Sequence, residues 1–176
     1  MSVQTTYTVA PRAAFAGMLV DGSNNQVMTM RNADVVSLAF GTPVAYKTSA
    51  PVSDKDAIAL VGSDKIAGII VHSHTYERTF TLPDGTVAGE LDTVGLTVGT
   101  EFGVLYSGEV WVKVFTAVAP GDAVYFADSV GAVYTANGQI GHTADAGHAT
   151  LITNASWQSA AAAGSFAKLR LAAKVA

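Results

Sequence analysis

The sequence predicts an all-β fold, a sandwich or a barrel, because turn residues recur at short intervals and the runs between them suit strands. Seventeen Gly and five Pro punctuate the 176 residues. The intervening stretches are rich in Val, Thr, Tyr, Phe and Ile, and they fit the two-residue period of a strand better than the 3.6-residue period of a helix. A chain of this length suits one domain with one core.

Residues 1–32 are expected to form an extended arm ahead of a single β-rich domain over residues 33–176. The apolar residues of this segment are scattered around the turn-like run Asp21-Gly22-Ser23-Asn24-Asn25 and follow neither period. An extended arm can add to the exposed edge of a neighbouring sheet through main-chain hydrogen bonds. The sequence is equally compatible with these residues covering the core of their own domain.

Short strands are expected over residues 41–47 and 66–71, which are apolar and bounded by turn residues. A hairpin is expected over residues 79–82 and 86–88, because Pro83-Asp84-Gly85 between them is a turn sequence. Together with the strands that follow, these segments reach the number that a sandwich or barrel requires.

The clearest strand covers residues 109–115, where valines at every second position alternate with Trp111, Lys113 and Phe115. Both faces are largely apolar, which is typical of a strand covered on both sides or of one at a subunit contact. Trp111 is the expected anchor of such a contact.

Turn sequences divide the remainder of the chain. Ala119-Pro120-Gly121-Asp122 predicts a turn before a strand over residues 123–127. A hairpin is expected from a strand over residues 133–135 and the turn pair Asn137-Gly138. A small-residue linker over residues 160–164 then leads into a last strand, on which Lys and Arg alternate with apolar residues over 166–171.

The composition excludes several classes of function. Charged residues make up 14% of the chain, against about 25% in typical soluble domains, so much of the surface is expected to lie against partners. A net charge of −4 without a basic run argues against a nucleic-acid partner. The absence of Cys excludes disulfides and thiol chemistry. No apolar run approaches the roughly 20 residues of a membrane span and no secretion signal is visible, so we expect synthesis in a cytoplasm and no membrane partner.

The motif His72-Ser73-His74, with Glu77 close behind, is the sharpest candidate for chemistry, because two imidazoles at i and i+2 share one face of a strand. It resembles the first metal motif of cupins, but Ile66 stands where cupins carry Gly, and their second motif is missing. His142 or His148 could supply a third ligand only through the fold. No nucleophile elbow, phosphate loop or paired general acid and base is present. The sequence therefore assigns no catalytic, cofactor-binding or metal residue, and the protein is expected not to be an enzyme.

Five segments, taken in order, resemble the head cement, or decoration, proteins of tailed bacteriophages. They are residues 11–30 (PRAAFAGMLVDGSNNQVMTM), 40–47 (FGTPVAYK), 67–77 (AGIIVHSHTYE), 106–126 (YSGEVWVKVFTAVAPGDAVYF) and 149–171 (ATLITNASWQSAAAAGSFAKLRL). The resemblance spans nearly the whole chain and offers a plain explanation for His72 and His74. It departs in the His-Ser-His motif and in a longer middle stretch over residues 84–100.

The resemblance implies a jelly-roll-like or β-barrel core with an extended N-terminal arm. It also implies a virion structural protein that is made in the host bacterial cytoplasm and then binds the outer surface of the capsid. The expected partners are the major capsid protein and further copies of the chain, as a dimer or trimer. Bridging neighbouring capsomers would stabilise the shell against the pressure of packaged DNA. Capsid or subunit contacts are expected from apolar residues of the arm and of the Trp-containing strand, namely Tyr7, Phe15, Met18, Met28, Met30, Trp111 and Phe115.

A second hypothesis is a ligand- or glycan-binding β-sandwich module of a phage tail or virion surface. It requires exposed aromatic platforms, for which Trp111, Trp157, Tyr76 and Tyr134 are the candidates. A third hypothesis, a cupin-like metalloenzyme, depends on the His-Ser-His motif.

Overall fold

The computed structural model describes residues 14–20, 24–49, 51–60, 66–73, 80–81, 87–88 and 96–172, and within them the chain forms strands and no helix. The strands are β1 (Gln26–Asn32), β2 (Pro43–Tyr46), β3 (Asp56–Ala59), β4 (Ile66–Ile70), β5 (Phe80–Thr81), β6 (Val87–Ala88), β7 (Glu101–Lys113), β8 (Tyr125–Ala127), β9 (Ile140–Gly141), β10 (Ala149–Leu151), β11 (Ala155–Trp157) and β12 (Phe166–Leu171). The predicted all-β fold class is confirmed.

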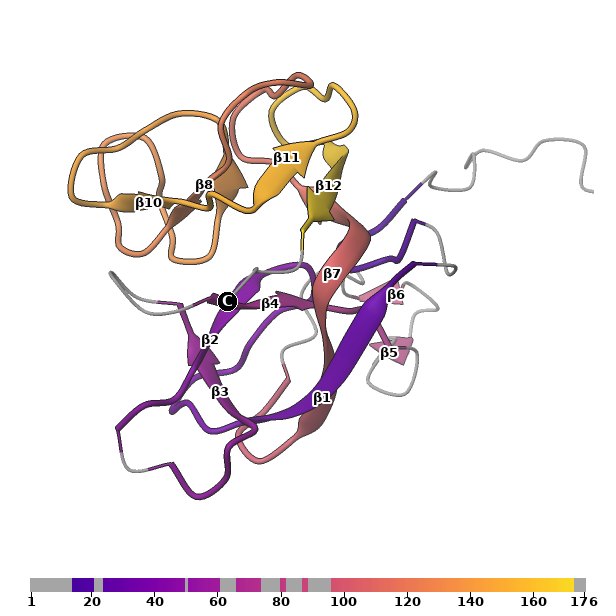
Figure 1. Cartoon of the computed structure of the whole chain (residues 1–176), viewed down its shortest axis with the longest axis vertical. Helices are drawn as coiled ribbons and strands as arrows, with labels where there is room; N and C mark the ends of the chain where they lie inside the picture. The colour runs from indigo at the N-terminus through magenta and orange to yellow at the C-terminus, as the bar shows by residue number, and fades with distance from the viewer. Residues whose placement is uncertain are drawn as a thin grey trace, which may run out of the picture.

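Five of the strands close into a barrel in the order β1-β3-β2-β4-β7, with β7 returning to β1. The closing pair β1–β7 is antiparallel and extends from Gln26 to Arg31. At the opposite edge β1 meets β3 in a short parallel pair. The expected hairpin of β5 and β6 is also present, with Phe80 opposite Ala88. Figure 1 shows β1, β2, β3, β4 and β7 around the barrel, with β8, β10, β11 and β12 grouped above it.

Strand β7 is shared between the barrel and the upper group. Its first part pairs with β1 and β4, and its second part, from Gly108 to Lys113, pairs with β12. Gly108 lies where the partners change, with φ +129°, and a Cβ there would overlap the side chain of Asn25. That side chain accepts a hydrogen bond of 2.9 Å from the backbone N–H of Glu109. The predicted strand over residues 109–115 therefore covers only the last part of β7, which begins earlier, at Glu101, and ends at Lys113.

Two hydrophobic clusters fill the molecule, one inside the barrel and one between the barrel and the upper group. Alternation along the shared strands supplies both, since Val44 and Val104 belong to the first cluster while their neighbours Ala45 and Leu105 belong to the second. The first cluster consists of Met30, Leu38, Phe40, Val44, Ala57, Ala67, Ile70, Leu96, Phe102 and Val104. Barrel strands with apolar residues on both faces are the physical reason why the two parts pack as one body.

The predicted arm over residues 1–32 needs a correction at its C-terminal end. Residues 26–32 form β1 of the barrel, where Met30 is 1% exposed and Asn32 is fully buried. Residues 14–20 lie along the second part of β7, with Leu19 bridged to Val110. Residues 1–13 and 21–23 lie outside the described residues. The arm therefore stays a prediction for residues 1–13. Residues 14–20 and 26–32 instead cover the chain's own core.

Gly17 connects residues 14–20 to β7 and to the chain just after β4 through backbone hydrogen bonds. Its N–H donates to the carbonyl of Trp111 at 2.8 Å, and its carbonyl accepts from the N–H of His72 at 2.9 Å. Its φ is +80°, and a Cβ would lie 2.7 Å from the backbone N of His72. Only glycine fits both the left-handed conformation and this close approach.

The C-terminal half confirms some predicted elements and corrects one. The turn at Pro120-Gly121 and the strand β12 are present, whereas the strand expected over residues 123–127 is shorter, beginning at Tyr125. The hairpin over residues 133–138 is wrong: residues 133–135 form no strand. Tyr134 is instead buried, and its hydroxyl donates to the carbonyl of Thr143 at 2.8 Å. Packing of this ring against the core outweighs the local preference for a hairpin.

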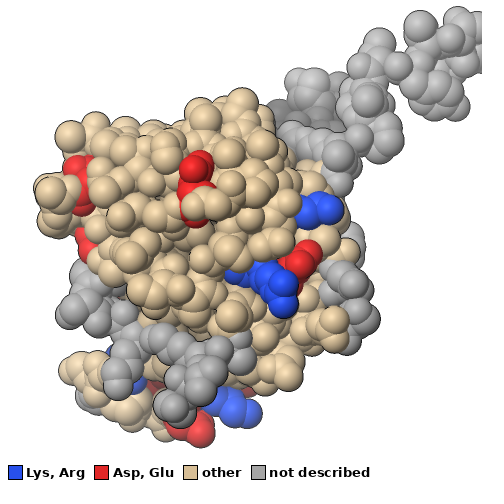
Figure 2. All heavy atoms as spheres, turned by 45° about the horizontal axis from the view of Figure 1, so that its top comes forward, with Lys and Arg blue, Asp and Glu red and all other residues tan. Residues whose placement is uncertain are grey.

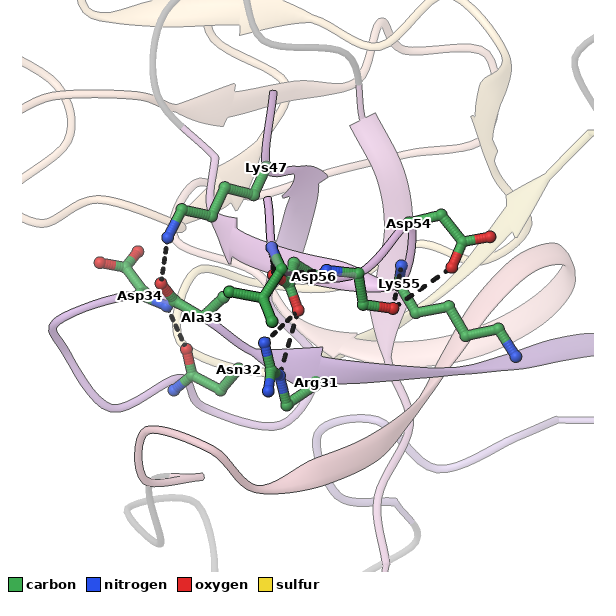
Figure 3. Close-up of polar contacts among 10 residues, drawn as sticks. Arg31, Asn32, Ala33, Asp34, Lys47, Asp54, Lys55 and Asp56 are labelled. Carbon is green, nitrogen blue, oxygen red and sulfur yellow. Dashed lines mark hydrogen bonds and ion pairs between the residues drawn. The ribbon is translucent and has the colours of Figure 1, made fainter. Parts of the chain in front are cut away.

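A polar cluster holds the chain where β1 meets β3 (Figure 3). Arg31 donates from Nε and Nη2 to Oδ1 of Asp56, at 3.1 and 2.7 Å. The other carboxylate oxygen of Asp56 accepts from the N–H groups of Val52 and Ser53. Nearby, the side-chain amide of Asn32 donates to the carbonyl of Leu96 at 2.8 Å. The buried side chains of Asp56 and Asn32 are thus hydrogen-bonded, so the cluster fixes the junction of β1 with β3.

Replacing Asp56 by Asn is expected to lower the thermal unfolding midpoint at neutral pH, by an amount that shrinks in acid. Burial acts to raise the pKa of Asp56, but the hydrogen bonds from Val52, Arg31 and Ser53 and the charge of Arg31 outweigh it and hold the pKa below the ordinary value of 3.8. The contribution of the carboxylate is therefore complete above that value and is lost as the pH falls through the lower folded-state pKa.

Thermal melts followed by circular dichroism between pH 7 and pH 2 measure this effect. Asp54→Asn is the matched control, because Asp54 is an exposed carboxylate two residues away. A difference between Asp56→Asn and the parent protein that stays constant over the whole pH range would contradict the assigned role.

Candidate interaction surface

A mixed aromatic and basic surface covers the outward side of the sheet formed by β7 and β12. Val110 and Val112 of β7 point inward and are fully buried, as are Ala167 and Leu169 of β12. The residues between them point outward, since side chains alternate along a strand. We call this surface the Trp111 face; it consists of Glu109, Trp111, Lys113, Phe166, Lys168 and Arg170.

The strand register determines which of these side chains are neighbours. Lys168 lies directly opposite Trp111, and Arg170 lies opposite Glu109. The ammonium of Lys168 is 5.3 Å from the centroid of the Trp111 ring. A cation over an indole at a partly exposed site contributes about 0.5–1 kcal/mol. The pairing therefore restrains the ring while leaving it half-buried.

The N-terminal segment extends this face on the other side of β7. The N–H of Trp111 donates to the carbonyl of Met18 at 2.8 Å, and the N–H of Val20 donates to the carbonyl of Glu109 at 3.0 Å. Because Leu19 is bridged to the inward-facing Val110, alternation places Met18 and Val20 on the outward side. Both are half-buried, so apolar contacts border Trp111 opposite Lys168.

Basic residues are concentrated on the Trp111 face. The described residues include six Lys and Arg, and three of them, Lys113, Lys168 and Arg170, belong to it. Glu109 is the acidic residue among the six that define the face. Outside the face, the described basic residues Arg31, Lys47 and Lys55 lie in one polar cluster with Asp34, Asp54 and Asp56 (Figure 3). Figure 2 shows a view in which uncharged residues predominate. The face is thus locally basic on a chain of net charge −4.

A second feature is a hollow of about 480 Å³ at one mouth of the barrel. Met28, Tyr46 and Tyr106 continue the inward-facing positions of their strands beyond the buried core, and the Tyr46 hydroxyl lies 3.5 Å from Sδ of Met28. Both tyrosines remain more than a third exposed. The lining described by the structure is uncharged: Met28, Tyr46, Ile66, Ala67, Gly68, Tyr106, Asn154 and Leu171.

The predicted contact residues separate into different environments. Trp111 lies on the Trp111 face with Met18 at its border, while Met28 lines the hollow at the barrel mouth. Met30 does not serve as a contact residue in this structure, because it is a core residue at 1% exposure. Tyr7 lies outside the described residues.

Phe15 and Phe115, the remaining two, pack against other rings. Phe15 is tilted against His72 with centroids 4.3 Å apart, and Phe115 lies 5.8 Å from Tyr134. Both phenylalanines are half-buried. They therefore contribute to packing within the domain, and only part of their surface is exposed to a partner.

Two of the aromatic platforms expected for a glycan-binding module are buried in the core. Trp157 is 2% exposed, and its indole N–H points to the carbonyl of Ala123 at 3.3 Å. Tyr134 is fully buried, and burial raises its pKa above the ordinary value of 10.0. Tyr76 lies outside the described residues. Trp111 is the one candidate that the structure describes as partly exposed.

The histidines of the metal hypothesis have separate surroundings. His72 packs between the rings of Phe15 and Phe40, at 4.3 and 4.9 Å. His142 and His148 contact Thr116 and Ser129, respectively. His74 and Glu77 lie outside the described residues, which contain no group of three His, Cys, Asp or Glu side chains able to hold a metal ion. Nothing in the described part favours the cupin-like enzyme.

Sequence reasoning missed the basic half of the Trp111 face. Alternation showed that Phe166, Lys168 and Arg170 share one side of the last strand, but not that this side continues the side of Trp111. Only the pairing of β12 with β7 brings the two rows together. The hollow was missed for the same reason, because Tyr46 and Tyr106 are 60 positions apart along the chain.

Comparisons with known proteins come from a family model and from solved structures. The model described as structural cement protein (E217 gp24/Pam3 gp6) matches residues 3–172. A chain from the capsid of Myoviridae phage XM1 superposes with a TM-score of 0.62 at 19% identity, over 97% of this chain and 95% of that chain. No curated protein matches. In the described residues, no helix is long and apolar enough to cross a membrane.

Proposed function

The chain belongs to the phage structural cement protein family, and from this we propose that it binds the outer surface of a capsid shell and bridges neighbouring capsomers. The observation that carries the proposal is the family match over residues 3–172, which includes the barrel, the upper group of strands and the Trp111 face. A capsid cement role follows from membership, whereas the outer position and the bridging are the proposed part.

Bridging gives such a protein its effect without catalysis. Packaged DNA presses outward, and a protein attached to two neighbouring capsomers resists their separation. Each contact can be weak, because a second attachment within the same assembly gains from effective concentration and raises avidity about 10²-fold or more. We propose no enzymatic role, and the partner is the major capsid protein.

Self-association as a dimer or trimer belongs to the same proposal. A charge content of 14% and an uncharged hollow at the barrel mouth support it, since the centres of protein interfaces are depleted of charge. Closed symmetry is the usual arrangement of such oligomers. Sedimentation equilibrium of the purified protein measures the number of copies.

The test of the proposed function uses purified particles of the source phage. Quantitative mass spectrometry is expected to find the protein at a copy number close to that of the major capsid protein. Antibodies against it, which cannot enter a closed shell, are expected to label intact particles, and particles lacking it are expected to release DNA at a lower temperature. A handful of copies, or labelling only after the shell is broken, would overturn the proposal.

The structure does not favour a glycan-binding module as a second function. It required an exposed aromatic platform, and the structure buries Trp157 and Tyr134 in the core, while Tyr76 lies outside the described residues. The remaining described ring, Trp111, is half-buried and covered in part by Lys168.

A further inference from the structure

We propose that the Trp111 face is the surface that docks this protein on its shell, against an acidic patch of the major capsid protein. The inference rests on the proposed function and adds the side of the molecule that makes the contact and the charge of the partner.

Charge selects an acidic partner. Three cations and one carboxylate leave the face net positive, although the whole chain carries a net charge of −4. The carboxylate of Glu109 lies opposite Arg170 at one end of the face, so Lys113 and Lys168 extend the positive region away from it. Complementary charge raises the rate of association and suppresses wrong partners.

The same charge argues against a second copy of this chain as the occupant. A two-fold contact through the Trp111 face would place the same surface of both copies together. Six cations and two carboxylates would then share one interface, at a cost from like-charge repulsion. The uncharged hollow at the barrel mouth carries no such penalty.

The face is also a rigid platform for an anchoring side chain. Behind Trp111, Val110 and Val112 are fully buried, and the strand that carries it is bonded to β12 on one edge and to residues 17–20 on the other. The ammonium of Lys168 lies over the face of the ring and restrains it. Trp and Arg residues in such settings commonly dominate binding energy, and a preordered side chain loses less entropy on binding.

The experiment measures co-sedimentation of purified variants with shells that lack the protein, over a range of salt concentrations. Lys113→Glu combined with Arg170→Glu reverses two exposed cations of the face. Its charge-matched control is Lys55→Glu with Thr48→Glu and Ser49→Glu, which changes the net charge equally at exposed positions between β2 and β3, away from the face. A third variant, Lys113→Gln with Arg170→Gln, removes the charges without reversing them.

The Glu variant of the face is expected to bind at least about tenfold more weakly at low salt and to lose the salt dependence of the parent protein. The Gln variant is expected to bind with an affinity between those of the parent protein and the Glu variant. The control is expected to bind like the parent. Unchanged binding by the Glu variant, or equal losses in face variant and control, would overturn the inference while leaving the cement role intact. Failure of the parent protein to bind shells would instead contradict the proposed function.

Duplex DNA is the alternative acidic partner, and a gel-shift assay under the same salt conditions tests it. The parent protein is expected to show no shift at concentrations that saturate shells. A shift that the Glu variant abolishes, together with unchanged shell binding, would show that the face serves nucleic acid and that the inference is wrong.

Discussion

Deleting residues 1–32 is expected to unfold the protein rather than to yield a folded domain without its arm. The deletion removes β1, which closes the barrel against β7 from Gln26 to Arg31. It also removes Met30, whose loss from a core alone costs about 2–5 kcal/mol, and the buried Asn32, which holds the carbonyl of Leu96. A typical domain has a net stability of about 5–15 kcal/mol, so these combined losses exceed what it can tolerate. Loss of the cooperative melt in circular dichroism is the expected observation.

The matched control is a chain that begins at Ala14. It retains every contact of residues 14–20, including the hydrogen bond from Gly17 to Trp111. We expect this shorter truncation to melt cooperatively, and, if residues 1–13 act as the proposed arm, to bind shells more weakly. A folded, cooperatively melting protein without residues 1–32 would show that β1 is dispensable and that the barrel closure has been misjudged.

Replacing Trp157 by Ala is expected to destabilise the protein by about 3–5 kcal/mol, the usual cost of removing a large aromatic side chain from a core. Trp157 is 2% exposed and belongs to the cluster between the barrel and the upper group of strands. For a chain of this size, that loss corresponds to a fall in Tm of roughly 6–20 °C. Differential scanning calorimetry measures it directly.

Ser156→Ala is the control for this substitution, because Ser156 is the adjacent exposed residue on the outward side of β11. Its effect is expected to stay within about 0.5 kcal/mol. The comparison also separates two views of Trp157. A binding platform would tolerate the change to Ala with an unchanged Tm and lose a ligand, and that outcome would return the glycan-binding hypothesis to consideration.

Local patterns predicted several elements correctly because short-range physics decides them. The turn at Pro120-Gly121 follows from a fixed proline φ and a permissive glycine, and β12 follows from strict alternation over residues 166–171. The valines at 110, 112 and 114 were recognisable as one row for the same reason, and the structure shows that this row faces inward. Each of these features depends only on residues that are neighbours in the sequence.

The predictions that failed depend on residues far away in the chain. Residues 133–135 have the sequence of a strand but form none, because Tyr134 packs in the core beside Phe115. Residues 26–32 lack a clear period because the polar Asn32 is buried at an inward position of β1, while the apolar Val27 is exposed. They form a strand because they pair with β7, 70 or more positions later in the chain.

The sequence by itself determined the all-β class, the low surface charge and, through an ordered resemblance, the family to which the chain belongs. Only the tertiary structure decided that β1 closes a barrel, that Met30 and Trp157 are core residues, and that the row of Lys168 and Arg170 lies beside Trp111. The physical reason is the range of the interactions. Composition and turn chemistry are local properties, whereas strand pairing joins distant segments, and the shared face of two strands exists only once their register is set.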